Sequence, residues 1–113
     1  MSDHQANPDV DPLEVDVAYT VRARTSHATQ IVDVREPDEW DEGHIPGAIH
    51  IPLGDLAARL GELDPTRPVI AVCRSGQRSL LAAEELGAVG FGDAVSLAGG
   101  MIAWHEAGRP VER

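Results

Sequence analysis

Short apolar runs predict the strands of this chain. Residues 31–34 and 69–72 are apolar at nearly every position, as in strands buried on both faces. Residues 94–97 predict a further strand, and residues 48–51 predict a short one after a Pro-Gly turn. Residues 13–17 alternate apolar and acidic side chains, which indicates a strand with one wet face.

Helical patterns separate these strands. Residues 37–42 begin with proline at a first helical position, carry acids in the first turn and end at Gly43, a stop signal. Residues 53–63 place apolar side chains at helical spacing. Strands that alternate with helices predict an α/β domain, with a mainly parallel sheet covered by helices on both sides. The predicted helices are 18–27, 37–42, 53–63, the run after Ser79 and 101–107.

The chain divides into a short tail and one domain. Residues 1–12 are polar, acidic and proline-bearing, and they predict a flexible acidic N-terminal tail. Residues 13–113 are enough for a single core, with no room for a second. No apolar run approaches a membrane span, and no signal-peptide pattern opens the chain. A net charge of −10 argues against nucleic-acid or anionic-membrane partners. A cytoplasmic protein is expected, with a monomer favoured.

Residue usage narrows the chemistry further. All nine basic residues are arginine, which excludes a Schiff-base lysine and a phosphate-loop lysine. Cys73 is the only cysteine, which excludes an intramolecular disulfide and a cysteine-rich metal site. The four carboxylates of residues 37–42 are interpreted as a solvated helix face, because they cannot all point inward. Neither a metal nor a cofactor is expected.

Cys73 follows the 69–72 strand in a short polar turn that leads into a helix. A helix start leaves backbone N–H groups unpaired and carries partial positive charge. Gly76 allows a tight turn whose amides converge on the sulfur, and Arg74 and Arg78 add full positive charges. These effects favour the thiolate over the thiol. The alternative is a buried structural cysteine, which is common for lone cysteines, but two arginines and a glycine within five residues argue against it.

Three motifs resemble the rhodanese-like sulfurtransferases. Residues 73–79, Cys-Arg-Ser-Gly-Gln-Arg-Ser, are similar to the active-site loop of that family. Residues 33–48 contain Asp-Val-Arg-Glu and Gly-His-Ile-Pro-Gly-Ala, and residues 97–104 read Leu-Ala-Gly-Gly-Met-Ile-Ala-Trp, with a glycine pair that allows close backbone approach. The motifs cover residues 13–112 in the order of the family. The resemblance implies the three-layer rhodanese fold with a sheet of five strands.

The resemblance also implies a thiosulfate sulfurtransferase reaction without cofactor or metal. Cys73 would take the outer sulfur of thiosulfate, or of a similar small sulfur-containing anion, and hold it as a persulfide. Cyanide, a thiol or a partner protein would then accept that sulfur. Asp33 and Arg35 lie near the end of the predicted strand at 31–34, so they are expected to support the site, although an ion pair that only holds local turns is the alternative. The expected persulfide-binding loop comprises Arg74, Ser75, Gly76, Gln77, Arg78 and Ser79.

Several other activities use related residues. A protease-like Cys–His pair could involve His44 or His50, but the resemblance gives His44 a role in shaping the domain. A cysteine phosphatase is disfavoured, because its loop holds five residues between cysteine and arginine, whereas Cys73 and Arg78 enclose four. Arsenate reduction and a non-enzymatic sulfur-relay or interaction module remain as alternatives.

Overall fold

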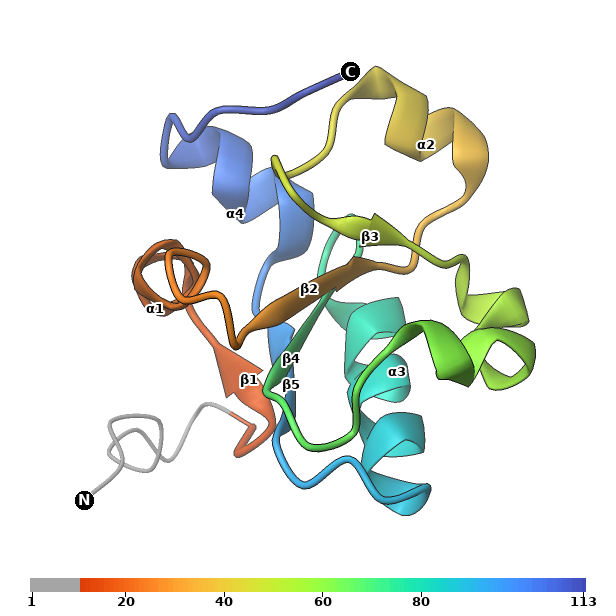
Figure 1. The fold of residues 1–113 in the computed structure, drawn as a ribbon. Coiled ribbons are helices and arrows are strands. Elements are labelled where there is room, and N and C mark those ends of the chain that lie inside the picture. The colour runs from red at the N-terminus through yellow and green to blue at the C-terminus, as the bar shows by residue number, and fades with distance from the viewer. Residues whose placement is uncertain (1–10) are drawn as a thin grey trace.

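The computed structural model describes residues 11–113, so the predicted tail, except for its last two residues, lies outside the described part. The domain has three layers, with a five-stranded sheet between two layers of helices (Figure 1). The strand order is β1-β5-β4-β2-β3 and every neighbouring pair is parallel, which confirms the predicted α/β fold. The strands are β1 (Glu14–Val15), β2 (Gln30–Asp33), β3 (Ile49–His50), β4 (Val69–Val72) and β5 (Ala94–Leu97).

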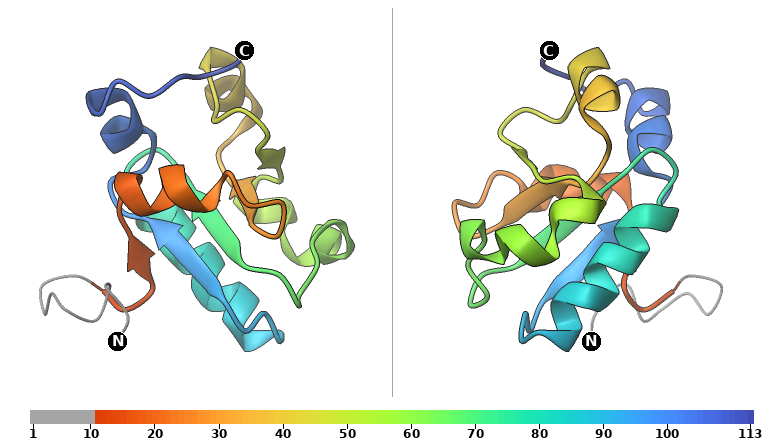
Figure 2. Two further views of the ribbon diagram at one scale, coloured as in Figure 1. Left: turned by 60° about the vertical axis from the view of Figure 1, so that its left-hand side comes forward. Right: turned by 90° about the vertical axis from the view of Figure 1, so that its right-hand side faces the viewer.

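Helices cover both faces of the sheet (Figure 2). Helix α3 and two 3-10 helices pack on one face, and helices α1 and α4 pack on the other. Among residues 11–113, no helix is long and apolar enough to cross a membrane. The helices are α1 (Val17–Ala23), α2 (Pro37–Glu42), η2 (Leu53–Asp55), η3 (Ala57–Glu62), α3 (Gln77–Ala88) and α4 (Gly100–Glu106).

The central strand β4 divides its side chains between two apolar cores. Val69 and Ala71 lie in the core beneath α3, whereas Ile70 and Val72 lie in the core beneath α1 and α4. This alternation follows from the period of two along a strand, with both faces of the sheet covered. Trp104 of α4 is fully buried in the core beneath α1 and α4. Cys73 continues the alternation and belongs to the core on the α3 side.

The first strand ends earlier than the alternating pattern predicts. Asp16 accepts a hydrogen bond from the backbone N–H of Tyr19 at 2.8 Å and caps α1, so Val17 already belongs to the helix. The same cap explains why the first helix begins one residue before the predicted segment. That helix also ends at Ala23, four residues before the predicted end.

The predicted helix at 53–63 is wrong in type, because the structure forms two 3-10 helices there. Gly54 and Gly61 are poor helix formers, and the backbone of Arg59 is non-helical, with φ −116° and ψ 19°. The apolar spacing still identifies the side of this segment that faces the core, since Leu56 is buried in the core beneath α3. The periodicity therefore identified the buried face but not the hydrogen-bonding pattern of the backbone.

Candidate active site

The sulfur of Cys73 lies at the carboxyl end of β4 and accepts hydrogen bonds from the loop that follows. Only 1% of the residue is exposed. The backbone N–H groups of Gly76 and Ser79 point at Sγ, with N···Sγ distances of 3.1 and 3.3 Å. The hydroxyl of Ser79 lies 3.3 Å from the same sulfur. We call Cys73, Gly76 and Ser79 the sulfur cradle; its donors favour negative charge on Sγ.

The start of α4 holds the loop in the orientation that makes this cradle. The backbone N–H groups of Met101 and Ile102 donate to the carbonyl oxygens of Cys73 and Arg74, at 2.8 and 3.1 Å. Gly100 has φ +54°, and a Cβ at this position would collide with both of those carbonyl groups. The glycine pair at 99–100 therefore permits the close backbone approach that the sequence predicts. The loop carbonyls bind α4, which leaves the loop amides free to face the sulfur.

Gly76 makes the turn within the cradle. Its φ is +101°, in the left-handed region that residues with a side chain rarely adopt. A Cβ at this position would also lie 3.0 Å from the backbone nitrogen of Gly99. Both the backbone conformation and the close packing thus require glycine at the start of α3.

Arg78 lies beside the cradle, but its guanidinium already has a partner. Its Nη1 and Nη2 donate to the two carboxylate oxygens of Glu39 in α2, at 2.7 and 2.8 Å. This paired hydrogen bond lowers the pKa of Glu39 to about 2 and raises the pKa of Arg78 above its usual value. Glu39 also accepts the backbone N–H of Glu36 at 3.0 Å, so the capping box of α2 orients the carboxylate.

Arg74 has the opposite character. It is exposed, and within the described part of the chain its side chain has no hydrogen-bond or ion-pair partner. Ser75 and Gln77 are exposed on the same loop. We call Arg74, Arg78 and Glu39 the cation rim. Within this cation rim, Arg74 carries the positive charge that is available to an incoming anion.

Asp33 and Arg35 form a buried ion pair, and within residues 11–113 neither side chain makes a hydrogen bond to the loop of Cys73. Nη2 of Arg35 lies 2.8 Å from Oδ2 of Asp33 and also donates to the carbonyl oxygen of Gly43 at 2.8 Å. The pair therefore fastens the end of β2 to the end of α2. This geometry matches the alternative that the pair holds local turns. A supporting role of the pair at the site stays a prediction.

The two histidines near Pro46 pack against one tryptophan. The rings of His44 and His50 stack on Trp40, with ring centroids 3.5 and 4.6 Å away. Nδ1 of His44 lies 3.0 Å from the carbonyl oxygen of Trp40, and Nε2 of His50 lies 2.8 Å from that of Arg35. In residues 11–113, no hydrogen bond joins either ring to Cys73. The geometry supports a structural role for His44 and gives no Cys–His pair.

The acidic helix α2 is exposed apart from Glu39 and Trp40, which are partly covered. Within the described residues, no group of three or more His, Cys, Asp or Glu side chains is arranged to hold a metal ion. The structure gives the acidic segment one specific function, which is to present Glu39 to Arg78.

Ser96 is a neighbour of the site that the sequence patterns did not single out. Its hydroxyl lies 2.7 Å from the hydroxyl of Ser79, and both residues are fully buried. The available signal was a polar residue in the middle of the otherwise apolar segment 94–97. A buried polar group of this kind needs a hydrogen-bond partner, so its position in a central strand indicates a neighbouring polar site.

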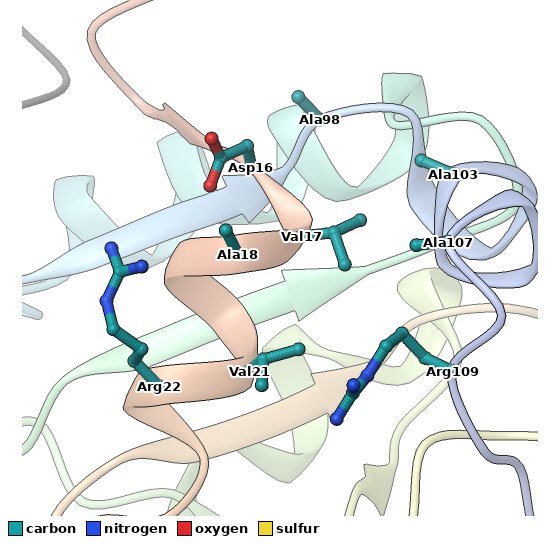
Figure 3. A pocket seen from close by; sticks show the side chains of 9 residues that line it. All are labelled: Asp16, Val17, Ala18, Val21, Arg22, Ala98, Ala103, Ala107 and Arg109. Carbon is teal, nitrogen blue, oxygen red and sulfur yellow. The ribbon is translucent and has the colours of Figure 1, made fainter.

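A separate groove lies between α1 and α4, on the other face of the sheet (Figure 3). Its volume is about 670 Å³. Val17 and Val21 of α1 face Ala103 of α4 and Ala107, the residue that follows α4, across the groove, and Arg109 extends into it. No residue of the sulfur cradle or the cation rim lines this groove, so it is distinct from the site at Cys73.

Comparisons with known proteins found relatives that match most of this chain. The sequence matches the family of the rhodanese-like domain over residues 17–107. It is 41% identical over 91 residues to the thiosulfate sulfurtransferase GlpE of Shewanella oneidensis, covering 80% of this chain and 90% of that protein. YrkF of Bacillus subtilis is 36% identical over 87 residues, which are 77% of this chain but only 47% of YrkF.

A solved structure shows the same fold. The crystal structure of a rhodanese-related protein from Thermoplasma volcanium superposes with a TM-score of 0.80 and 31% sequence identity. The match covers 88% of this chain and 96% of that one. The arrangement of one sheet between two helical layers is therefore shared over nearly the whole of both chains.

Proposed function

The chain belongs to the rhodanese-like domain family, and we propose that it is a sulfurtransferase that works through a Cys73 persulfide. Its named relatives support sulfur transfer in general. The finer proposal is that a sulfane sulfur moves from thiosulfate, or a similar anion, to cyanide, a thiol or a protein acceptor. The observation that carries it is the convergence of two backbone amides and one hydroxyl on Sγ, at 3.1 to 3.3 Å.

In the first half-reaction the thiolate of Cys73 attacks the outer sulfur of thiosulfate. A bond forms between Sγ and that sulfur, the sulfur–sulfur bond of thiosulfate breaks, and sulfite leaves with the bonding electron pair. The negative charge then resides on the outer sulfur of the persulfide. The loop amides and the start of α3 are expected to stabilise this anion, by the logic of an oxyanion hole.

The cation rim serves the arrival of the donor. Arg74 is exposed and has no partner within the described residues, so it attracts the thiosulfate dianion. Arg78 contributes positive charge near the sulfur, but Nη1 and Nη2 of its guanidinium already bind the carboxylate of Glu39. A donor oxygen can use Arg78 fully only after displacing that carboxylate. We therefore assign capture of the thiosulfate donor to Arg74. Arg78 stays paired with Glu39 and keeps its positive charge in a fixed place near the sulfur.

In the second half-reaction the acceptor attacks the outer sulfur, and Sγ leaves as a thiolate. Cyanide becomes thiocyanate, whereas a thiol becomes a persulfide. The enzyme returns to its starting state with no external oxidant or reductant. Two covalent half-reactions that share one intermediate give ping-pong kinetics.

Steady-state kinetics test this proposal. The wild-type protein is expected to form thiocyanate from thiosulfate and cyanide, with parallel double-reciprocal lines when one substrate is varied at several concentrations of the other. The Cys73→Ser variant is expected to form none. Ser26→Ala is the matched control, because Ser26 is an exposed serine that follows α1 and accepts a hydrogen bond from the backbone N–H of Ala28, away from the loop of Cys73. Equal activity in the Cys73→Ser variant would refute the persulfide route.

A further inference from the structure

Ser96 is a polar residue in the middle of β5, where a core side chain is expected. It is fully buried, and the residues on either side of it, Val95 and Leu97, are core residues beneath α1 and α4. Successive side chains alternate between the faces of a sheet, so Ser96 points to the opposite face, toward α3. A hydroxyl buried there is unfavourable unless it is hydrogen-bonded. The buried hydroxyl of Ser96 therefore indicates a hydrogen-bond partner close by.

The partners of Ser96 form a chain of hydroxyl groups that ends at the sulfur. Its Oγ lies 2.7 Å from Oγ of Ser79, which lies 3.3 Å from Sγ of Cys73. At the other end, Ser96 lies 3.4 Å from the carbonyl oxygen of Gly76. That carbonyl also accepts the backbone N–H of Leu80 at 3.2 Å, so it keeps a partner when the Ser96 hydroxyl turns away. Ser96 can thus donate in either of two directions.

We propose that Ser96 is a positioning residue for Cys73, which acts through Ser79 as a reversible hydroxyl relay. This inference rests on the proposed sulfur transfer, because that cycle changes the charge on Sγ. When Sγ is a thiolate, Ser79 donates to the sulfur and Ser96 donates to Ser79. When Sγ is a thiol, the thiol donates to Ser79, Ser79 donates to Ser96 and Ser96 donates to Gly76.

The relay keeps every hydroxyl proton bonded in both states. No proton passes between the two serines, since each hydroxyl only turns about its Cβ–Oγ bond. A hydroxyl that itself accepts a hydrogen bond is a stronger donor, so Ser96 strengthens the bond from Ser79 to the thiolate. The relay therefore stabilises Sγ as a thiolate, both as the resting nucleophile and as the leaving group of the second half-reaction.

A test that needs no sulfur donor is the pH profile of Cys73 alkylation by iodoacetamide. Ser79→Ala is expected to move the midpoint of that profile upward by about one pH unit, because a direct bond to the thiolate is lost. Ser96→Ala is expected to move it upward by about half a unit, because only the strengthening of that bond is lost. The double variant is expected to match Ser79→Ala. The ion pair between Arg78 and Glu39 involves neither serine, so all three variants are expected to keep it.

The plateau rate at high pH separates the relay from a loss of structure. Removing the relay leaves the thiolate as reactive or slightly more so, so the plateau does not fall, whereas a disordered site lowers it. Thr20→Val is the matched control, since Thr20 of α1 also carries a fully buried hydroxyl, but that hydroxyl donates to the backbone carbonyl oxygen of Asp16, away from Cys73. Its midpoint is expected to equal that of the wild type, even where its thermal stability falls.

Three results would overturn the proposal. The first is a Ser96→Ala midpoint equal to the wild type in a protein that melts cooperatively. The second is a Ser96→Ala shift of the same size in the Ser79→Ala background, since Ser96 would then act independently of Ser79. The third is an equal shift in Thr20→Val. Alkylation requires only the thiolate, so these outcomes judge the relay whether or not thiosulfate proves to be a donor.

Discussion

The sulfur cradle and the cation rim lie side by side but are built in different ways. The cradle consists of backbone amides and a buried hydroxyl, fixed by contacts between the loop and α4. The rim consists of half-exposed or exposed side chains, of which one arginine is paired and the other is not. Donors held by the backbone cost no reorganisation when charge develops, whereas exposed side chains are solvated and adaptable. We expect the sulfur cradle to determine how fast sulfur is transferred from a bound donor, and the cation rim to determine how strongly the donor binds.

The largest expected effect comes from breaking the support of the cradle. Gly100→Ala forces a Cβ into the carbonyl groups of Cys73 and Arg74 and places alanine at φ +54°. A displacement of the loop by about 1 Å is expected to lower kcat/KM for thiosulfate by about 100-fold or more. The variant is also expected to lose about 1–3 kcal/mol in the free energy of unfolding, measured with urea.

Gly87→Ala is the matched control for that substitution. Gly87 lies within α3, and a Cβ there would have open space around it. Alanine in a helix is favoured over glycine, so this variant is expected to gain about 0.5–1 kcal/mol and keep its activity. Full activity in Gly100→Ala would show that α4 does not hold the cradle.

A smaller effect is expected when the unpaired cation of the rim is removed. Arg74→Gln is expected to raise KM for thiosulfate about tenfold, mainly through donor capture, with kcat nearly unchanged. The difference from the wild type should shrink at high ionic strength. Arg22→Gln is the control, since Arg22 is an exposed arginine of α1, on the other face of the sheet. A fall in kcat alone would assign Arg74 to the chemical step.

Releasing the paired cation is expected to have a smaller effect of the opposite sign. Glu39→Gln removes the carboxylate that binds Nη1 and Nη2 of Arg78. The two Nη groups of Arg78 can then bind the oxygens of the donor, so KM for thiosulfate is expected to fall about threefold. An increase in KM would mean that Glu39 is needed to hold Arg78 in place. Initial rates at low thiosulfate concentration decide between the two.

The smallest effect concerns stability at low pH. The pKa of Glu39 is lowered to about 2 from an ordinary value of 4.5, so its pairing stabilises the folded state fully above pH 4.5. That contribution is lost as the pH falls from 4.5 toward 2. Side chains that are 20% and 35% exposed limit it to about 1 kcal/mol or less. Urea unfolding of the wild type and Glu39→Gln should give a constant difference above pH 5 that vanishes near pH 2.

Much of the cradle could be predicted from the sequence, because its parts are local. An apolar run, a cysteine, a glycine and a helix-forming segment lie within about twenty consecutive residues, and each has a strong conformational preference. The structure places β4, the turn at Gly76 and α3 where that pattern indicates. The approach of Gly100 also followed from the glycine pair, although the carbonyl groups that it contacts did not.

The rim and the relay could not be predicted in the same way. Glu39 and Arg78 are 39 residues apart, and Glu39 is one of four carboxylates in a single short helix. Only the tertiary fold, which brings Glu39 of α2 to Arg78 in the first turn of α3, selects which of them meets the arginine. Ser96 carries no motif, and its role depends on the register that brings β5 beside β4. The 3-10 helices at 53–62 were missed because apolar spacing does not distinguish them from an α-helix.

The most direct test of the account is the intact mass of the protein after incubation with thiosulfate and removal of the excess. The wild type is expected to gain the mass of one sulfur atom, and cyanide is expected to remove it with stoichiometric release of thiocyanate. Cys73→Ser should gain nothing, whereas Arg74→Gln should gain the same mass at a higher thiosulfate concentration. A wild-type protein that gains no sulfur, or a Cys73→Ser variant that gains one, would contradict the claim that the cradle around Cys73 carries the transferred sulfur.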